Sequence, residues 1–193
     1  SGHTTPQLPF ASTSSSIYIP RPPSNTEAWL IPFKQLQFEQ LLTPMCHACC
    51  NCSKVFKGSW LGKEVVIRVY ESSGTLSDTV TSKCMELISR MARIRHPNIS
   101  LFMAASVTSN KFCILTEYVV NGCLKNTVQH AFSVQNVLHI AKGMAVGCAY
   151  LRKQGFSHKN LKPSNILIDG SIEVKLTDYF VQEFNQVFSH QCT

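Results

Sequence analysis

Four cysteines and one histidine fall within seven residues of the chain, at Cys46, His47, Cys49, Cys50 and Cys52. Thiolate and imidazole groups at such short spacing can hold a zinc ion or take part in thiol redox chemistry. A structural zinc site takes four ligands, usually from two separated pairs, and no second pair follows nearby in the sequence. A metal site, a redox site and a segment that has neither role all remain alternatives here.

The composition predicts a soluble, cytoplasmic protein built around one core. The chain has 193 residues, of which 44% are hydrophobic, enough for a domain-sized core that two lobes can share. It contains no apolar run that could span a bilayer and does not start like a secretory signal. The nine cysteines are an odd number, and Cys84, Cys113 and Cys148 lie in apolar runs, which favours buried thiols over disulfides.

The net charge of +7 is modest and spread along the chain. Four lysines gather late, at Lys153, Lys159, Lys162 and Lys175. Such a group favours a phosphate-bearing ligand or forms a solvated basic face. Because no RNA- or DNA-binding motif accompanies these lysines, we expect no nucleic-acid partner, and no membrane span.

The order of predicted elements indicates an α+β protein. Residues 1–26 are rich in Ser, Thr and Pro and poor in charge, which is typical of a disordered arm. Apolar, β-branched runs predict strands at 54–60, 64–70, 100–107 and 111–119. Helices and a closing hairpin alternate with these strands, so a small sheet would meet a helical part.

Two helices are predicted from apolar residues spaced three and four apart. Ser77 or Asp78 would cap the first helix and Pro97 would end it. Its buried face would comprise Val80, Cys84, Leu87, Ile88 and Met91. The second helix would span 134–153 and bury Val137, Ile140, Ala141, Met144, Cys148 and Leu151. The hairpin follows, with Asp169-Gly170 as its turn and Ile172, Val174 and Leu176 alternating along its second strand.

The segment "GFSHKNLKPSNILI" (155–168) resembles the catalytic loop of protein kinases, whose pattern is H-R-D-L-K-x-x-N. Other segments resemble kinase motifs in the same order: "VFKGSWLGKEVVIRV", "RIRHPNISLFMAAS", "ILTEYVVNGCL" and "KLTDYF". The resemblance extends from Trp29 to Phe180 and is strongest to the tyrosine-kinase-like group, in its Raf and kinase-suppressor-of-Ras branch, through "WLIPF", "LFM", Arg68 and "HK". More loosely, the chain is similar to ankyrin-repeat pseudokinases of germ-cell intercellular bridges.

This resemblance implies an α+β, protein kinase-like fold. Residues 27–119 would form an antiparallel-sheet N-lobe with one helix, together with the hinge. Residues 120–193 would form a truncated, mainly helical C-lobe. Because no A-P-E motif or later helices follow in the sequence, we expect a fragment of a larger protein or a truncated form.

The resemblance also assigns a nucleotide site, in which Thr116 would be the gatekeeper. No cofactor would be required, although ATP would fit, with or without Mg²⁺ on Asn165 and Asp178. The nucleotide-binding positions implied by the family are Val55, Arg68, Thr116, Glu117, Tyr118, Lys162, Asn165 and Asp178.

Several positions depart from the kinase pattern. The glycine-rich loop that covers the ATP phosphates falls on Ala48–Ser53, which contains no glycine. The cysteine cluster would therefore occupy a degenerate loop. Arg68 replaces the strand lysine, and Asn160 replaces the catalytic aspartate. A neutral amide cannot accept the proton of a substrate hydroxyl as a carboxylate does.

Further departures surround these positions. An ungapped count places Leu87 where the family has a helix glutamate, so an ion pair between Arg68 and the neighbouring Glu86 is not expected. Phe180 replaces the glycine that follows the Asp178 motif, and His158 is expected to support the loop backbone.

These losses favour a pseudokinase module, not an enzyme, that acts as a scaffold or allosteric regulator in signalling or cell division. Its partners would be proteins, among them kinases and signalling or cytoskeletal proteins. The alternative is an atypical ATP-binding serine/threonine kinase with weak activity. A nucleotide-binding switch without catalysis and a metal or redox sensor are further readings that the sequence leaves open.

Overall fold

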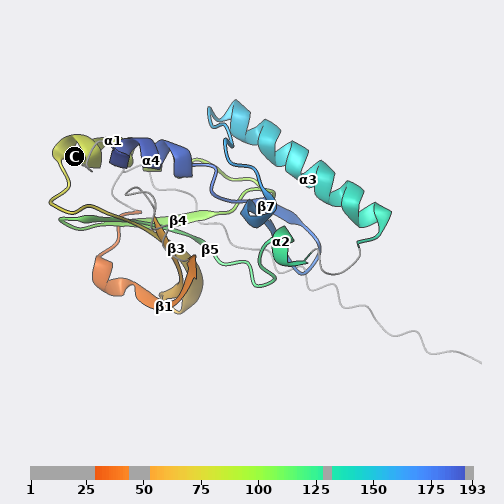
Figure 1. Ribbon diagram of the computed structural model, residues 1–193, viewed down its shortest axis with the longest axis horizontal. Helices are drawn as coiled ribbons and strands as arrows, with labels where there is room; N and C mark the ends of the chain where they lie inside the picture. Colours follow the sequence, from red (N-terminus) through yellow and green to blue (C-terminus); the bar gives the residue numbers. More distant parts are fainter. Residues whose placement is uncertain (1–28, 44–52, 128–131, 190–193) are drawn as a thin grey trace, which may run out of the picture.

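A five-stranded antiparallel sheet forms the first part of the fold (Figure 1). The computed structural model describes residues 29–43, 53–127 and 132–189. The strand order is β1-β2-β3-β5-β4. The bounds are η1 Phe33–Gln35 (a 3-10 helix), β1 Gln37–Thr43, β2 Lys54–Trp60, β3 Lys63–Glu71, β4 Phe102–Val107 and β5 Lys111–Glu117. Strands β2 to β5 confirm the four predicted strands, and β1 is an additional one.

Strands β2 and β3 are joined by a two-residue turn. Leu61 and Gly62 have φ values of 52° and 75°, as a tight hairpin with right-handed twist requires. The register pairs Val55 with Arg68, and Arg68 in turn with Ile114 on β5. Residues that pair directly across antiparallel strands face the same side of the sheet, so these three side chains share one face.

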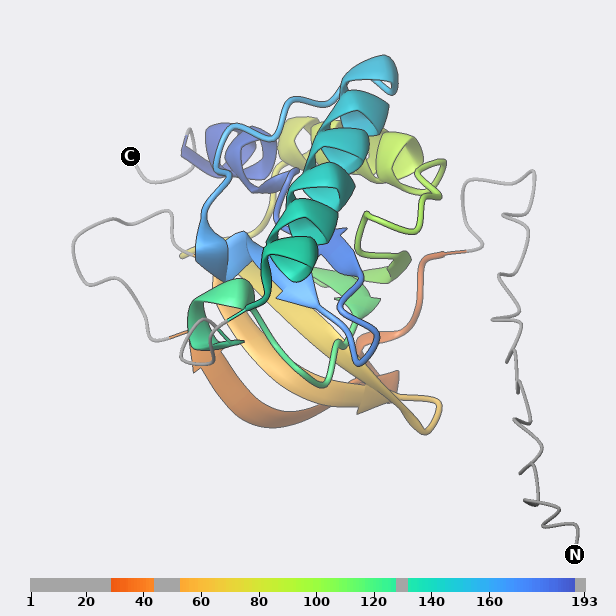
Figure 2. The same cartoon turned by 90° about the vertical axis from the view of Figure 1, so that its right-hand side faces the viewer.

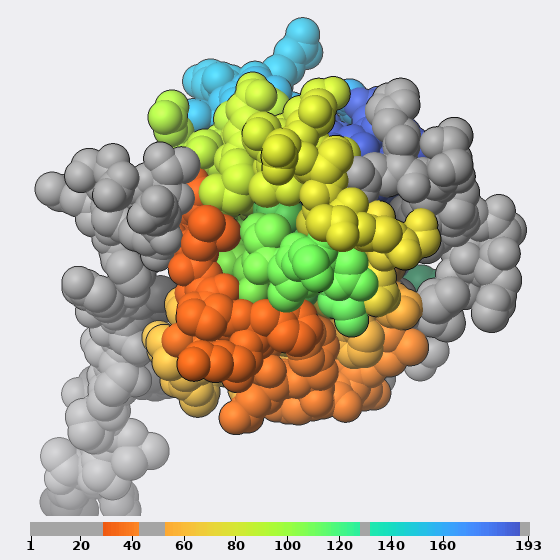
Figure 3. Space-filling view, turned by 90° about the vertical axis from the view of Figure 1, so that its left-hand side faces the viewer, coloured from red at the N-terminus to blue at the C-terminus, as the bar shows by residue number. Residues whose placement is uncertain are grey.

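The two faces of the sheet carry separate buried clusters. One cluster comprises Leu36, Val65, Ile67, Val69, Ala104, Cys113 and Leu115. On the other face, Tyr70, Phe102, Phe112 and Ile114 join the main core together with the helices. Figure 3 shows the N-terminal strands (orange), the β4–β5 region (green) and the helix that follows β3 (yellow) stacked on one side of the molecule.

Two helices, α1 Asp78–Met91 and α4 Val181–Ser189, lie side by side (Figure 1). The Ser77 hydroxyl caps α1 by accepting a hydrogen bond from Val80 N at 3.3 Å. All five residues predicted for its buried face are buried, which confirms that part of the prediction. The helix ends at Met91, however, so Pro97 does not end it; a loop separates the two.

Helix α3, Val134–Lys153, packs against a small hairpin (Figure 2). Its bounds confirm the predicted span, but its contact line differs from the prediction. Ile140, Gly147 and Leu151 are buried, whereas Val137 and Ala141 are exposed. The reason is Gly147, where an added Cβ would lie 3.0 Å from Asn98 O; the missing side chain lets the helix approach most closely along that line.

The hairpin consists of β6 Ile166–Ile168 and β7 Val174–Leu176, preceded by α2 Leu124–Thr127 and the 3-10 helix η2 Pro163–Asn165. Its turn is longer than the predicted Asp169-Gly170 pair. Asp169 Oδ1 accepts hydrogen bonds from Ser171 N and Glu173 N. Ile172, predicted to lie in the strand, has a φ of 65° and belongs to the turn. The Asp169 side chain therefore shapes a five-residue connection.

The arrangement confirms the predicted α+β, kinase-like fold with an antiparallel-sheet N-lobe. The predicted disordered arm 1–26 and the cysteine cluster Cys46–Cys52 lie outside the described residues. Cys84, Cys113, Cys123 and Cys148 are free thiols. Burial raises the pKa of the Cys84 and Cys113 thiols to about 12. In the described part of the chain, no helix combines the length and apolarity needed to cross a membrane.

Candidate functional site

A buried arginine links the sheet to the segment after the hairpin. Arg68 is only 9% exposed. Its Nη2 donates to Asp178 Oδ1 at 2.5 Å, and its Nη1 donates to Ser53 Oγ at 2.7 Å. Charge-assisted hydrogen bonds of this kind are the stronger class in proteins. The side chain therefore ties together the start of β2, the middle of β3 and the end of the hairpin segment.

The electrostatics of this pair favour the charged forms. Burial disfavours the charged guanidinium, but the Asp178 carboxylate, with a smaller contribution from Tyr70, outweighs it, so the pKa of Arg68 is raised. The two side chains are 11% and 22% exposed, so solvent screens them little. A fixed cation and a fixed carboxylate thus lie at the junction of the two lobes.

The loop before the hairpin is held by Asn165, which is only 4% exposed. Asn165 Nδ2 donates to Asn160 O at 2.8 Å, and Asn165 N donates to Lys162 O at 2.8 Å. Thr177 N donates to Asn165 O at 3.1 Å. These bonds fix the 160–165 loop beside the strand that leads to Asp178.

Asp178 itself has left-handed backbone geometry, with a φ of 64°. An aspartate adopts this region more readily than most residues. The backbone turn follows Thr177 directly, which places the Asp178 carboxylate on Arg68 while α4 begins three residues later. The sequence motif "TDYF" therefore produces a sharp change of direction at the site.

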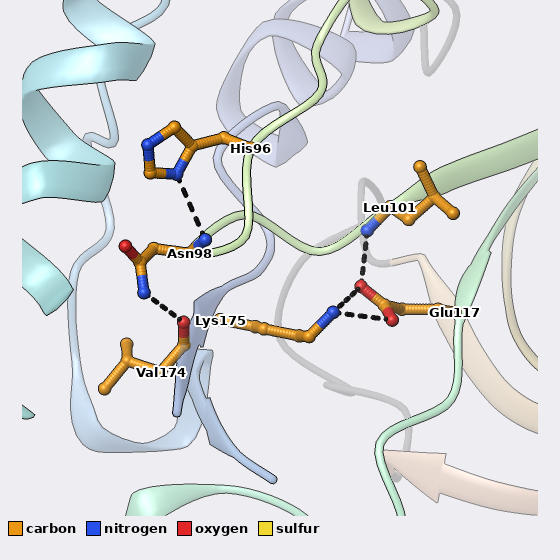
Figure 4. Close-up of polar contacts among 6 residues, drawn as sticks. All are labelled: His96, Asn98, Leu101, Glu117, Val174 and Lys175. Carbon is orange, nitrogen blue, oxygen red and sulfur yellow. Dashed lines mark hydrogen bonds and ion pairs between the residues drawn. The ribbon is translucent and has the colours of Figure 1, made fainter. Parts of the chain in front are cut away.

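The hinge end of the site is formed by β5 and the residues after it. Thr116 is buried at 6% exposure, and Val55 at 6% lies across the strands from Arg68. The Glu117 carboxylate accepts from Leu101 N at 2.8 Å and pairs with Lys175 Nζ at 2.8 Å (Figure 4). The Glu117 backbone N also donates to Leu101 O at 3.0 Å, so its expected contact with a nucleotide stays a prediction.

Tyr118, Lys162 and His158, which the sequence also placed in the site, lie in three different environments. The Tyr118 ring lies under Lys57 Nζ at 4.6 Å, a favourable cation–π geometry. Lys162 is exposed, and among the described residues no carboxylate pairs with its ammonium group. Burial lowers the pKa of His158, and its expected support of the loop backbone stays a prediction.

The structure brings some predicted site residues together and separates others. Arg68 contacts Asp178, and Asn165 contacts Asn160. Glu86 is exposed on α1, and Arg68 pairs with Asp178 instead. Of the degenerate glycine-loop segment Ala48–Ser53, only Ser53 belongs to the described residues.

Sequence reasoning missed the roles of Ser53 and Lys175. Ser53 holds Arg68, yet a serine next to a strand gives no signal that it will meet an arginine fifteen positions away. Lys175 faces the Glu117 carboxylate; the alternation along 172–177 showed that it projects away from the core but not what it meets.

The residue types present fit a magnesium ion. Mg²⁺ prefers oxygen ligands, often one or two carboxylates together with substrate phosphates. Arg68 uses Oδ1 of Asp178, so Oδ2 has no hydrogen-bond partner among the described residues. Asn165 donates through Nδ2, which leaves its Oδ1 as an acceptor. These two oxygens are the ones that would hold the ion.

Comparison with known proteins identifies the family. Residues 48–187 match the family described as "Protein tyrosine and serine/threonine kinase". The chain is 28% identical over 163 residues to "Serine/threonine-protein kinase STY17" of Arabidopsis thaliana, covering 83% of this chain and 28% of that protein. It is 30% identical over 168 residues to "Putative serine/threonine-protein kinase/receptor R826" of Acanthamoeba polyphaga mimivirus, covering 82% and 10%.

A third relative is "Serine/threonine/tyrosine-protein kinase HT1" of Arabidopsis thaliana, 26% identical over 160 residues, covering 79% of this chain and 40% of that protein. The chain thus spans well under half the length of these curated relatives. The expectation that the chain is not an enzyme is wrong, because the relatives that it matches are named kinases.

Residue-by-residue departures from a motif led to the expectation of a pseudokinase, yet the fold still pairs Arg68 with Asp178 and holds Asn165 beside Thr177. The family model matches most of the chain, residues 48–187, despite these departures. This match shows that the chain belongs to the protein tyrosine and serine/threonine kinase family.

Proposed function

We propose that the chain is the nucleotide-binding part of an atypical serine/threonine protein kinase, which binds ATP with Mg²⁺ and transfers phosphate slowly to a protein hydroxyl group. The observation that carries this proposal is the buried Arg68–Asp178 pair between the two lobes. A buried charge pair is costly to desolvate and is a weak source of stability. Its presence is better accounted for by a ligand that uses both charges.

Each residue has a distinct part in this proposal. Arg68, held by Ser53, would bind phosphate oxygens, for which a guanidinium fork is well suited. Lys162, which is exposed, would reach the terminal phosphate. Bound Mg²⁺, held by Asn165 and Asp178, would neutralise negative charge on the phosphates. Val55 and Thr116 would enclose the base between β2 and β5.

The rate is expected to be low because of Asn160. Its amide cannot take up the proton of the attacking hydroxyl. A positioned general base typically contributes about 10²- to 10⁴-fold to the rate. The remaining catalysis comes from positioning and charge, which make the largest contribution to phosphoryl transfer.

The same proposal covers the protein partners, the cellular location and the branch of the kinase family. The family acts on proteins, so the partners would be protein substrates and signalling or cytoskeletal proteins, in the cytoplasm. The Raf and kinase-suppressor-of-Ras branch is supported by Arg68 and by the "WLIPF" segment. The relatives named as serine/threonine kinases favour serine or threonine as the acceptor.

A thermal-denaturation titration of the chain with ATP, alone and with Mg²⁺, tests the binding step. Ligand at 100 times its Kd should add about 2.7 kcal/mol to the free energy of unfolding. Arg68→Ala and Asp178→Ala should remove this stabilisation, whereas Glu86→Ala, on the exposed side of α1, should keep it. No stabilisation of the wild-type chain, or equal stabilisation of all variants, would contradict the proposal.

The transfer step is tested separately, with the full-length protein. Radiolabelled ATP should yield slow phosphorylation of a serine- and threonine-containing protein substrate. Asn160→Asp restores a carboxylate at the position of the base, so we expect the rate to rise by about 10²-fold or more. A rate that Asn160→Asp leaves unchanged would show that this position has no part in the chemistry.

A further inference from the structure

A groove lies behind the hinge, outside the proposed phosphate site. It has a volume of about 390 Å³ and is bounded by the loop that leads to β4, the end of β5 and the β6–β7 hairpin. The exposed Pro97 and the half-buried Leu101 supply apolar surface to the groove, while Arg95, Asp169 and Glu173 supply charge. Its size is at the lower end of the range found for ligand pockets.

The groove is rigidly built. Asn98 Nδ2 donates to Val174 O at 2.9 Å, and Asn98 N donates to His96 Nδ1 at 3.0 Å (Figure 4). The Glu117 carboxylate joins Leu101 N to Lys175 Nζ on the other side. Because both walls are tied together by hydrogen bonds, little conformational freedom would be lost when a ligand binds.

The charges on the two walls have opposite signs. On the loop wall, Arg95 is half-buried, and its Nη1 donates only to Ile94 O, at 2.8 Å. Its Nε is buried without a hydrogen-bond partner. No carboxylate of the described residues pairs with this guanidinium. Burial lowers the pKa of Arg95, yet a guanidinium stays charged at neutral pH.

On the hairpin wall, carboxylates dominate. Asp169 and Glu173 both line the groove, and among the described residues the Glu173 carboxylate contacts the exposed His139 ring, at 3.1 Å. The third carboxylate, Glu117, is neutralised by Lys175. After that pair is set aside, the loop wall carries Arg95, and the hairpin wall carries Glu173 and Asp169, whose Oδ1 accepts backbone hydrogen bonds of the turn.

We propose that this groove binds a short extended peptide in which a large aliphatic residue lies between an acidic and a basic residue. The aliphatic side chain would cover Pro97 and Leu101. The acidic side chain would pair with Arg95, and the basic one with Asp169 and Glu173. This assignment follows from charge complementarity across an apolar floor, the usual arrangement for specific protein recognition.

The same charges exclude other ligand classes. A nucleic acid or a phosphorylated lipid surface presents negative charge alone, which Asp169 and Glu173 would repel. A purely apolar ligand would leave the half-buried Arg95 without a partner and remove it from water, at a cost in free energy. The site does not depend on the proposed ATP binding, because its charged walls are distinct from Arg68 and Asp178.

Fluorescence anisotropy of labelled peptides with the full 193-residue chain, without nucleotide, tests the proposal. The probes are Gly-Glu-Ala-Leu-Ala-Lys-Gly, the same peptide in reversed order, and a neutral version of each with Gln for Glu and Lys. We expect saturable binding of one of the two charged peptides. Its neutral version should bind at least fivefold more weakly, because two ion pairs are lost.

Matched variants locate the site. Arg95→Gln and Glu173→Lys should each raise the Kd of the bound peptide by about fivefold. Arg93→Gln and Glu39→Lys change the same residue types at exposed positions that do not line the groove and should leave the Kd unchanged. Thermal denaturation of each variant checks that it is folded.

Two results would overturn the proposal. One is the absence of saturable binding of either charged peptide to the wild-type chain, which needs no variant at all. The other is equal weakening by the groove variants and by their distant counterparts, which would indicate non-specific charge attraction. Loss of ATP binding with retained peptide binding would leave this site intact and contradict the proposed function alone.

Discussion

Helices α1 and α3 bury apolar residues to very different degrees. α1 buries all five side chains of its apolar face, each below 9% exposure. α3 is longer, yet it buries only Ile140, Gly147 and Leu151. It exposes several large apolar side chains, namely Val134 (71%), Val137 (51%), Leu138 (65%) and Val146 (42%).

The difference teaches that apolar periodicity finds a helix more reliably than it finds the buried face. α1 packs beside α4 in the main core, so apolar side chains fill the space on its inner face. α3 rests on the hairpin through Gly143 and Gly147, which lie close to Val174, Asn98 and Leu176. A helix that approaches through glycine turns its apolar residues elsewhere.

The largest expected effect on stability is at α4, the helix that packs beside α1. Phe184 is fully buried and contacts the rings of Tyr70, Phe112 and Phe180 at centroid distances of 5.3, 5.7 and 5.9 Å. Phe184→Ala should lower the free energy of unfolding by about 3–5 kcal/mol, through lost transfer energy and the cavity left behind. Urea denaturation measures it.

Val137→Ala, on the exposed part of α3, is the contrast. The change should cost less than about 0.5 kcal/mol, because the side chain is half in solvent. If Val137→Ala destabilised the chain as much as Phe184→Ala, α3 would have a covered face that the described residues do not show, and the comparison would fail.

Most of the fold could be predicted from the sequence. The face of α1, the span of α3 and strands β2 to β5 follow from local patterns of apolar residues. Helix α4 could not be predicted, because its place depends on Phe184 and Phe188 stacking on Tyr70, far away in the sequence. The five-residue turn at Asp169 depends on side-chain hydrogen bonds that a two-residue turn signal hides.

The sequence could identify the residues of the site but not the contacts between them. Arg68, Asn165 and Asp178 each follow from a motif, and the fold places them near the junction of the lobes. That Arg68 pairs with Asp178, 110 positions later, and with Ser53 depends on how the folded chain brings these separate segments together. No local pattern carries that information, and the same holds for Glu117 and Lys175.

An intermediate effect is expected at the glycine contact of α3. At Gly147 a Cβ would lie 3.0 Å from Asn98 O and 3.0 Å from Leu176 Cδ1. Gly147→Val should therefore force α3 away from the hairpin and cost about 1–3 kcal/mol in unfolding free energy. Ala145→Val, on the exposed side of the same helix, controls for the lower helix propensity of valine. Equal losses for both variants would show that the approach through Gly147 does not hold the helix.

The smallest expected effect is a pH dependence of the free energy of unfolding that comes from the sheet. Glu71, at the end of β3, lies between Lys111 Nζ at 3.2 Å and Lys54 Nζ at 3.3 Å. The hydrogen bond from Lys111, helped by Lys54, holds the pKa of Glu71 below its ordinary value of 4.5. A lowered folded-state pKa means that the stabilisation is complete above the unfolded value and is lost as the pH falls through the folded one.

Glu71→Gln should therefore flatten the acid side of the stability curve below about pH 4.5, with a difference at neutral pH of about 0.5 kcal/mol, as for other exposed ion pairs. Urea denaturation at a series of pH values, at low salt, measures it. Glu86→Gln removes a carboxylate from the exposed side of α1 and should leave the slope as in the wild type. If Glu86→Gln and Glu71→Gln flattened the curve equally, the effect would come from net charge, and the strand ends of the sheet would have no special role in acid sensitivity.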